Sequence, residues 1–176
     1  MSTELALILE AILLTANKPL SLEQLATFFA EEQVIDKASL KQGLKQLAEQ
    51  TQGRSFELIE TASGYRLQTK LVYSPWVSRH QEEKVSKYSR VFLETLALIA
   101  WRQPITRAEI EEIRGVAVNA NVLRALLERE WVRVLGHKEV PGRPELLGTT
   151  KQFLDYFNLK SLEDLPQLGE LKELGM

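Results

Sequence analysis

Apolar residues recur at helical spacing in two separate stretches of the chain, and each stretch leads into a turn that contains proline. The first helix is predicted by Leu5, Ile8, Leu9, Ile12 and Leu13. The second is predicted by Phe92, Leu96 and Ile99, with Leu93 and Ala97 widening the apolar face. Pro19-Leu20-Ser21 follows the first stretch and Pro104-Ile105-Thr106 follows the second, 85 positions later. This constant offset indicates an internal repeat.

The residues after each proline carry the same signals for the start of a helix. Ser21 and Gln24 fit a capping box, in which the hydroxyl accepts from a free N–H of the first turn and the glutamine reaches back. Thr106 and Glu109 repeat this arrangement. The flanking apolar residues suit a hydrophobic staple in both copies: Leu20 with Leu25, and Ile105 with Ile110. Two capping boxes with the same staple and the same upstream proline predict a second helix in each copy.

A third helix and a β-hairpin complete each copy. The third helices are predicted over residues 37–50 and 119–130, where leucine and valine recur on one face. The spacing of the apolar residues then changes from the helical period to the alternation that is typical of strands. This predicts strands at residues 56–60, 65–69, 131–134 and 145–149. A short helix follows each hairpin, at residues 71–78 and 151–157. Three helices followed by a hairpin describe a winged helix, so we expect a mostly α fold with small β-hairpins (α+β), arranged as two tandem winged-helix domains.

The repeat also predicts the domain boundaries. We expect an N-terminal winged-helix domain over residues 1–78, which mediates dimerisation, and a C-terminal winged-helix domain over residues 89–158. The charged residues 79–88 lack an apolar period and are predicted to form a linker. The tail, residues 159–176, has leucine at every third position but is interrupted by Pro166, which disfavours one continuous helix.

Composition and charge limit the cellular compartments and the kinds of partner that this protein can have. The chain has no cysteine, which excludes disulfides, thiolate–metal sites and a cysteine nucleophile and fits a reducing cytosol. The most apolar stretch, residues 5–16, is too short to span a bilayer and is preceded by Glu4 without Lys or Arg, so we expect neither a membrane span nor a signal peptide. The formal net charge is −2 and neither half is basic, which disfavours strong autonomous DNA binding.

The second half resembles the bacterial segregation and condensation protein B family. The residues that carry the resemblance are Leu93-Glu94-Thr95-Leu96-Ala97, the stretches 103–116 and 122–129, Val140-Pro141-Gly142-Arg143-Pro144, Gly148-Thr149-Thr150, Phe153-Leu154 and the stretch 161–166. They cover most of residues 90–168 in the expected order, whereas the first half matches only in its layout.

The resemblance implies a homodimer that binds the kleisin subunit, segregation and condensation protein A, and through it an SMC ATPase. It implies a non-catalytic subunit of a condensin-like complex in chromosome condensation and segregation during cell division, in the cytoplasm at the nucleoid. DNA contact would be indirect. The alternative from the residues alone is a winged-helix DNA-binding transcription regulator.

The kleisin contact is expected on the second domain, at its first helix, its wing and its closing helix. The candidate residues are Leu96, Arg143, Pro144, Phe153 and Phe157. Gly142-Arg143-Pro144 can be a stiff turn in which Gly142 takes a positive φ. Arg143 then either anchors a partner or pairs with a nearby carboxylate. Trp76, Trp101 and Trp131 lie near the domain edges, and we expect core or inter-domain packing for at least two of them.

The first helix has one charged residue, Glu10, between Leu5 and Asn17 and is otherwise apolar around its circumference, which is typical of a helix buried on more than one face. We expect a homodimer contact built from Leu5, Leu9 and Ile12, with burial inside the first domain as the alternative.

Lys37, Lys41 and Lys45 lie on one face of the third helix, where DNA-binding relatives place the recognition helix. A contact with DNA phosphates is possible there, and a solvated face is the more common outcome. The equivalent helix of the second copy balances Arg124 and Arg129 against Glu128 and Glu130, which suits a protein partner better.

No pattern of catalytic residues is present. His80 and His137 are the only histidines, and they lack metal-ligand spacing. Phosphate loops, dinucleotide-binding glycines and nucleophile elbows are also missing from the sequence. We therefore expect neither an enzyme nor a cofactor, and any nucleotide hydrolysis would belong to a partner.

Overall fold

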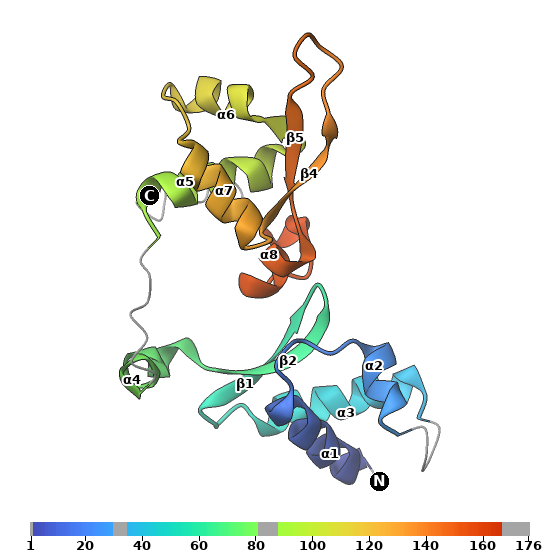
Figure 1. Cartoon of the computed structure of the whole chain (residues 1–176). Helices are drawn as coiled ribbons and strands as arrows, with labels where there is room; N and C mark the ends of the chain where they lie inside the picture. The colour runs from blue at the N-terminus through green and yellow to red at the C-terminus, as the bar shows by residue number, and fades with distance from the viewer. Residues whose placement is uncertain (1, 30–34, 81–87, 167–176) are drawn as a thin grey trace. The chain divides into compact units, whose positions relative to one another are not determined.

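The computed structural model describes residues 2–29, 35–80 and 88–166, and it divides into two compact units, Met1–Val85 and Ser86–Met176 (Figure 1). The division lies inside the stretch predicted as a linker, residues 79–88. Each unit has its own hydrophobic core.

Unit 1 consists of three helices followed by a hairpin, as the sequence predicts. The helices are α1 (Ser2–Thr15), α2 (Leu22–Thr27) and α3 (Lys37–Gln50), and the strands are β1 (Phe56–Thr61) and β2 (Gly64–Thr69). The antiparallel register pairs Phe56 with Thr69 and Thr61 with Gly64. Leucines from all three helices form the core with Ala6 and Phe29. The chain continues through a 3-10 turn, η1 (Leu71–Tyr73), into α4 (Ser74–His80).

A β-bridge joins the turn after α1 to the hairpin of unit 1. Leu20 and Tyr65 exchange two backbone hydrogen bonds, of 2.9 and 2.8 Å. Gly64 makes this approach possible: its φ is +140°, and a Cβ built there would lie 2.2 Å from the carbonyl oxygen of Leu20. Only glycine therefore fits this position without a shift of the backbone.

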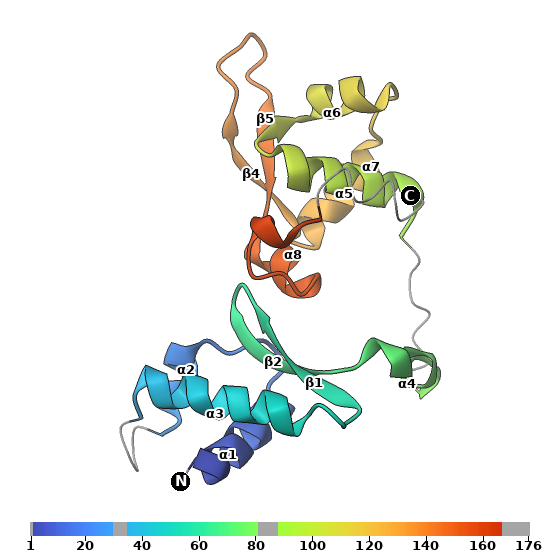
Figure 2. The ribbon, with the colours of Figure 1, turned by 180° about the vertical axis from the view of Figure 1, so that it is seen from behind.

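Unit 2 repeats the arrangement with a longer hairpin (Figure 2). It contains α5 (Arg90–Arg102), β3 (Ile105–Thr106), α6 (Arg107–Arg114), α7 (Ala120–Glu128), β4 (Val132–His137), β5 (Glu145–Thr149), α8 (Lys151–Tyr156) and the 3-10 turn η2 (Leu162–Asp164). The sheet order is β3-β5-β4, and Ile105 pairs with Leu147. The bridge at Ile105 occupies the place in unit 2 that the Leu20 bridge occupies in unit 1, 85 positions earlier, so the sequence repeat is also a structural repeat.

Both predicted capping boxes are confirmed. The Ser21 hydroxyl accepts from the backbone N–H of Gln24, whose side chain accepts from the Ser21 N–H. Thr106 and Glu109 make the equivalent pair. The staple residues are buried in both units, since Leu20 and Leu25 lie in one core and Ile105 and Ile110 in the other.

Several element ends differ from the prediction. Strand β4 extends to His137 instead of Val134, with Leu135 as an extra residue at a bulge. The bulge interrupts the alternation of apolar and polar residues from which the strand was predicted. The residues after the bulge therefore did not fit the strand pattern. Helix α4 extends to His80, two residues past the expected domain end.

The first part of the predicted tail belongs to unit 2. Leu159 and Leu165 pack against the core, and the Trp101 indole N–H donates to the Pro166 carbonyl at 3.0 Å. Leu162 begins η2, and residues 167–176, with the last three tail leucines, lie outside the described residues.

Candidate partner-binding surfaces

The outer face of α1 is apolar and exposed. Leu7, Ile8 and Leu14 are 56%, 41% and 60% exposed. Of the residues predicted for the dimer contact, Leu9 is fully buried, and Leu5 and Ile12 are half-buried against the core of unit 1. The prediction of Leu9 as a dimer contact is therefore corrected. Apolar residues surround almost the whole circumference of α1. Their spacing therefore could not show which face of the helix packs against the rest of the unit.

The lysines of α3 are all exposed, and one of them has a partner. The Lys37 ammonium lies 2.6 Å from a Glu23 carboxylate oxygen. Its hydrogen bond lowers the pKa of Glu23 to about 2. Within the described part of the chain, no carboxylate pairs with Lys41 or Lys45. The face thus offers two cations to a ligand rather than three.

The wing of unit 2 presents Arg143 at its tip. Gly142 has a φ of +85°, which confirms its predicted role in the turn, and Arg143 itself has a φ of +39°. The Arg143 guanidinium lies 3.4 Å from Glu139, and both side chains are largely exposed. Pro144 is half-buried, and its carbonyl closes the loop by accepting from the Lys138 N–H. Such an exposed ion pair contributes little to stability, so Arg143 is accessible to a partner.

Two of the predicted kleisin contacts are core residues. Leu96 and Phe153 are each only 3% exposed and belong to the buried cluster of unit 2, which corrects both predictions. Phe157 is 38% exposed, with its ring 5.3 Å from Trp131 and 4.9 Å from Phe153. Trp131 is buried in this aromatic cluster, whereas Trp76 in unit 1 is 64% exposed. Side chains of α5 and α8 that face inward cannot be separated by sequence from those that face a partner, because both are apolar.

An open groove of about 780 Å³ lies beside the closing helix of unit 2. Its apolar lining comes from four elements: Leu127 of α7, Val132 and Val134 of β4, Leu154 of α8, and Leu162 of η2. Glu130, Arg133 and Lys151 add charges to the lining. Leu127, Val134 and Leu162 are each about two-fifths exposed, at 37%, 40% and 41%. The prediction missed these residues because they come together only when the four elements pack.

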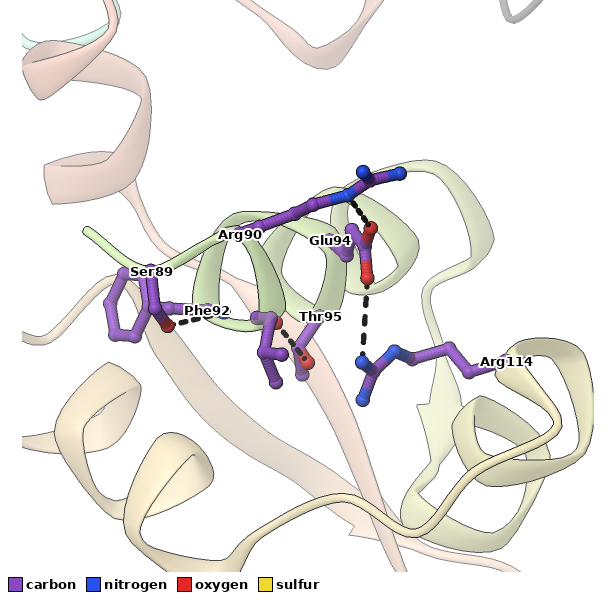
Figure 3. A network of polar contacts seen from close by, with 7 residues as sticks. Ser89, Arg90, Phe92, Glu94, Thr95 and Arg114 are labelled. Atoms are coloured by element: carbon purple, nitrogen blue, oxygen red, sulfur yellow. Dashed lines mark hydrogen bonds and ion pairs between the residues drawn. The ribbon is translucent and has the colours of Figure 1, made fainter. Parts of the chain in front are cut away.

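A polar network joins α5 to α6 (Figure 3). Glu94 accepts from the Arg90 Nε at 2.7 Å and from the Arg114 Nη2 at 3.4 Å. The hydrogen bond from Arg90 is the main reason that the pKa of Glu94 lies below its ordinary value. The Arg114 side chain is only 9% exposed, so Glu94 compensates a largely buried charge. Glu94, which belongs to the family-like stretch Leu93–Ala97, therefore has a structural role in unit 2.

The described residues contain no group of three side chains suited to hold a metal ion. His80 ends α4 and His137 ends β4, and both are exposed.

None of the helices in residues 2–29, 35–80 and 88–166 has the length and apolar character that crossing a membrane requires.

Comparisons with known proteins agree on one family. The family model described as "Segregation and condensation complex subunit ScpB" matches residues 7–168. The segregation and condensation protein B homolog of Coxiella burnetii is 50% identical over 168 residues, which cover 96% of this chain and 80% of that protein. The protein of the same name from Syntrophotalea carbinolica is 43% identical, over 98% of this chain and 86% of that protein.

A solved structure, that of ScpB from Mycobacterium tuberculosis, is 33% identical over 90% of this chain and 98% of that one, with a TM-score of 0.41. The family match spans both winged-helix units, and the first half therefore shares more with the family than its layout. The chain belongs to the segregation and condensation complex subunit ScpB family.

Proposed function

We propose that this chain is a non-catalytic subunit of a condensin-like SMC–kleisin complex that acts in chromosome condensation and segregation. In this proposal it binds the kleisin subunit directly and the SMC ATPase through the kleisin, in the cytoplasm at the nucleoid. Family membership supports the role in segregation and condensation. Two apolar surfaces, one on each unit, are available for the contacts that such a subunit makes.

The observation that carries kleisin binding is the groove of unit 2. Leu127, Val134 and Leu162 leave apolar area in water along one concave surface. An amphipathic helix or extended segment gains free energy by covering such a surface. The nearby charges of opposite sign, Glu130 against Arg133 and Lys151, favour a partner segment of mixed charge. Arg143 and Phe157 extend this surface in the proposal.

Unit 1 is proposed to form the homodimer through the outer face of α1. Three large apolar side chains on one helix face, Leu7, Ile8 and Leu14, are unfavourable in water and suit a self-complementary contact. Dimerisation would place two kleisin-binding grooves in one assembly.

The groove is tested by measuring kleisin affinity with calorimetry for a Leu127→Ser/Leu162→Ser variant. Both side chains are partly exposed, so the substitutions leave the core intact. We expect affinity to fall at least about tenfold, because contact residues are lost from an apolar interface. The matched control is Ile113→Ser/Val116→Ser, which changes two exposed apolar residues of unit 2 outside the groove. Equal kleisin affinity for both variants and the unmodified chain would place the contact elsewhere.

A further inference from the structure

The segment that follows the hairpin of unit 1 has almost no support from its own unit. We call residues 70–80, which contain η1 and α4, the arm. Leu71, Val72, Tyr73 and Trp76 are 83%, 67%, 41% and 64% exposed, and neither η1 nor α4 contains a buried residue. Among the described residues, the core of unit 1 includes no apolar side chain of the arm. Lys70, the first residue of the arm, is held by hydrogen bonds to carbonyls of residues 51, 52 and 55. Figures 1 and 2 both show α4 at the end of a stretch that leaves β2 away from α1, α2 and α3.

Such an element is unfavourable in isolation. A helix as short as the seven residues of α4 is marginal in water without tertiary contacts. An exposed tryptophan adds a large apolar area, and contiguous exposed apolar residues mark interaction sites. The arm therefore requires a surface that covers it.

The α1 face of the same unit is the complementary surface. It is also apolar and exposed, at Leu7, Ile8 and Leu14. The charges are complementary as well: α1 carries Glu4 and Glu10 and no basic residue, whereas the arm carries Lys70 and Arg79 and no acidic residue. Two of these charges already interact within unit 1: Glu10 lies 3.8 Å from Arg54, and Lys70 donates to the Gln52 carbonyl at 2.6 Å. Glu4 of α1 and Arg79 of the arm are therefore the charges left to pair between the two surfaces.

We propose that the arm of one copy covers the outer face of α1 in a second copy, and that the exchange is reciprocal. A two-fold dimer places residue i against residue j and j against i, so one contact type covers both exposed surfaces of both chains. The occupant of the α1 face is thus a specific segment of the second copy. This inference rests on the proposed homodimer and adds to it the segment, the arm, that covers the α1 face at the interface.

Crosslinking tests the contact directly, because the chain has no native cysteine. A size-tagged Val72→Cys chain is mixed with an Ile8→Cys chain and treated with a short bifunctional thiol reagent. We expect a crosslinked heterodimer on a denaturing gel. The control mixes Val72→Cys with Ile113→Cys, an exposed apolar position in unit 2, and should give no such product. A chain with both Val72→Cys and Ile8→Cys, diluted until monomeric, should not crosslink internally.

Light scattering separates this inference from the proposed dimer. If the unmodified chain is monomeric at micromolar concentration, both fail. If it is dimeric but Val72 and Ile8 do not crosslink between chains, or crosslink within one chain, only the arm exchange is overturned.

A second variant adds a quantitative readout. Trp76→Ser should weaken dimerisation by about tenfold or more, as expected for an anchoring tryptophan. Tyr156→Ser, which changes a similarly exposed aromatic residue of unit 2, should leave the dimer unchanged. Equal dimer affinity for both variants would contradict the proposal.

Discussion

At the scale of single residues, Gly64 shows how one position determines the packing of a whole unit. It begins β2 with a φ of +140° and lies against the backbone of Leu20 and Ser21. The neighbouring residue, Tyr65, makes the bridge to Leu20. A side chain at Gly64 would displace backbone atoms, which cannot rotate away as the end of a flexible side chain can.

We predict that Gly64→Ala lowers the free energy of unfolding by about 2–4 kcal/mol, through backbone strain and overpacking. Urea denaturation followed by circular dichroism measures the change. Gly53→Ala is the matched control, because a Cβ there meets no atom within 4 Å. A Gly64→Ala variant as stable as the control would mean that the turn can move without cost.

At the scale of elements, a charged pair links α6 to the hairpin of unit 2. The Lys138 ammonium, just after β4, lies 2.6 Å from a Glu109 carboxylate oxygen. The other oxygen of Glu109 accepts from the Thr106 backbone N–H at 2.8 Å and so completes the capping box. The hydrogen bond from Lys138 is the largest of the interactions that lower the pKa of Glu109 to about 2.

This shift predicts a pH dependence of stability. Because folding lowers the pKa of Glu109, its contribution is fully present above the ordinary carboxyl value of about 4.3 and is lost as pH falls towards 2. Glu109→Gln should therefore flatten the loss of stability between about pH 5 and pH 2. Thermal unfolding across this range measures the effect, with Glu112→Gln on the exposed side of α6 as control. Identical pH profiles for Glu109→Gln and the unmodified chain would show that the pair has no such role.

At the scale of the whole molecule, charge favours a protein-binding subunit over a DNA-binding regulator. The formal net charge is −2, and Glu23 neutralises one of the three α3 lysines. Affinity for duplex DNA depends mainly on the number of phosphates that cations contact. Lys41 and Lys45 alone are too few to hold a duplex at physiological salt.

We predict that the chain alone binds duplex DNA no more tightly than about 10⁻⁶ M at physiological salt, which is the non-specific range. A Lys41→Gln/Lys45→Gln variant should bind duplex with unchanged affinity in a fluorescence anisotropy titration. Tight, salt-sensitive binding that disappears in the variant would favour the transcription regulator instead.

The sequence by itself determined the repeat, the order of elements and the family. These depend on signals that neighbouring residues carry: the apolar period, and the pairs Ser21 with Gln24 and Thr106 with Glu109. Such signals act over a few residues along the chain, so they can be read without the fold. The resemblance of the second half to the ScpB family is confirmed, and the family match also covers the first half, for which only the layout was recognised.

Only the tertiary structure decided which apolar residues face outward. Leu9 and Leu96 are buried, whereas Leu7 and Trp76 are exposed, although all four are apolar residues in predicted helices. The groove of unit 2 combines side chains from α7, β4, α8 and η2, which are separated along the chain. Exposure depends on which surfaces the other elements cover, and that is a property of packing between distant segments rather than of local pattern.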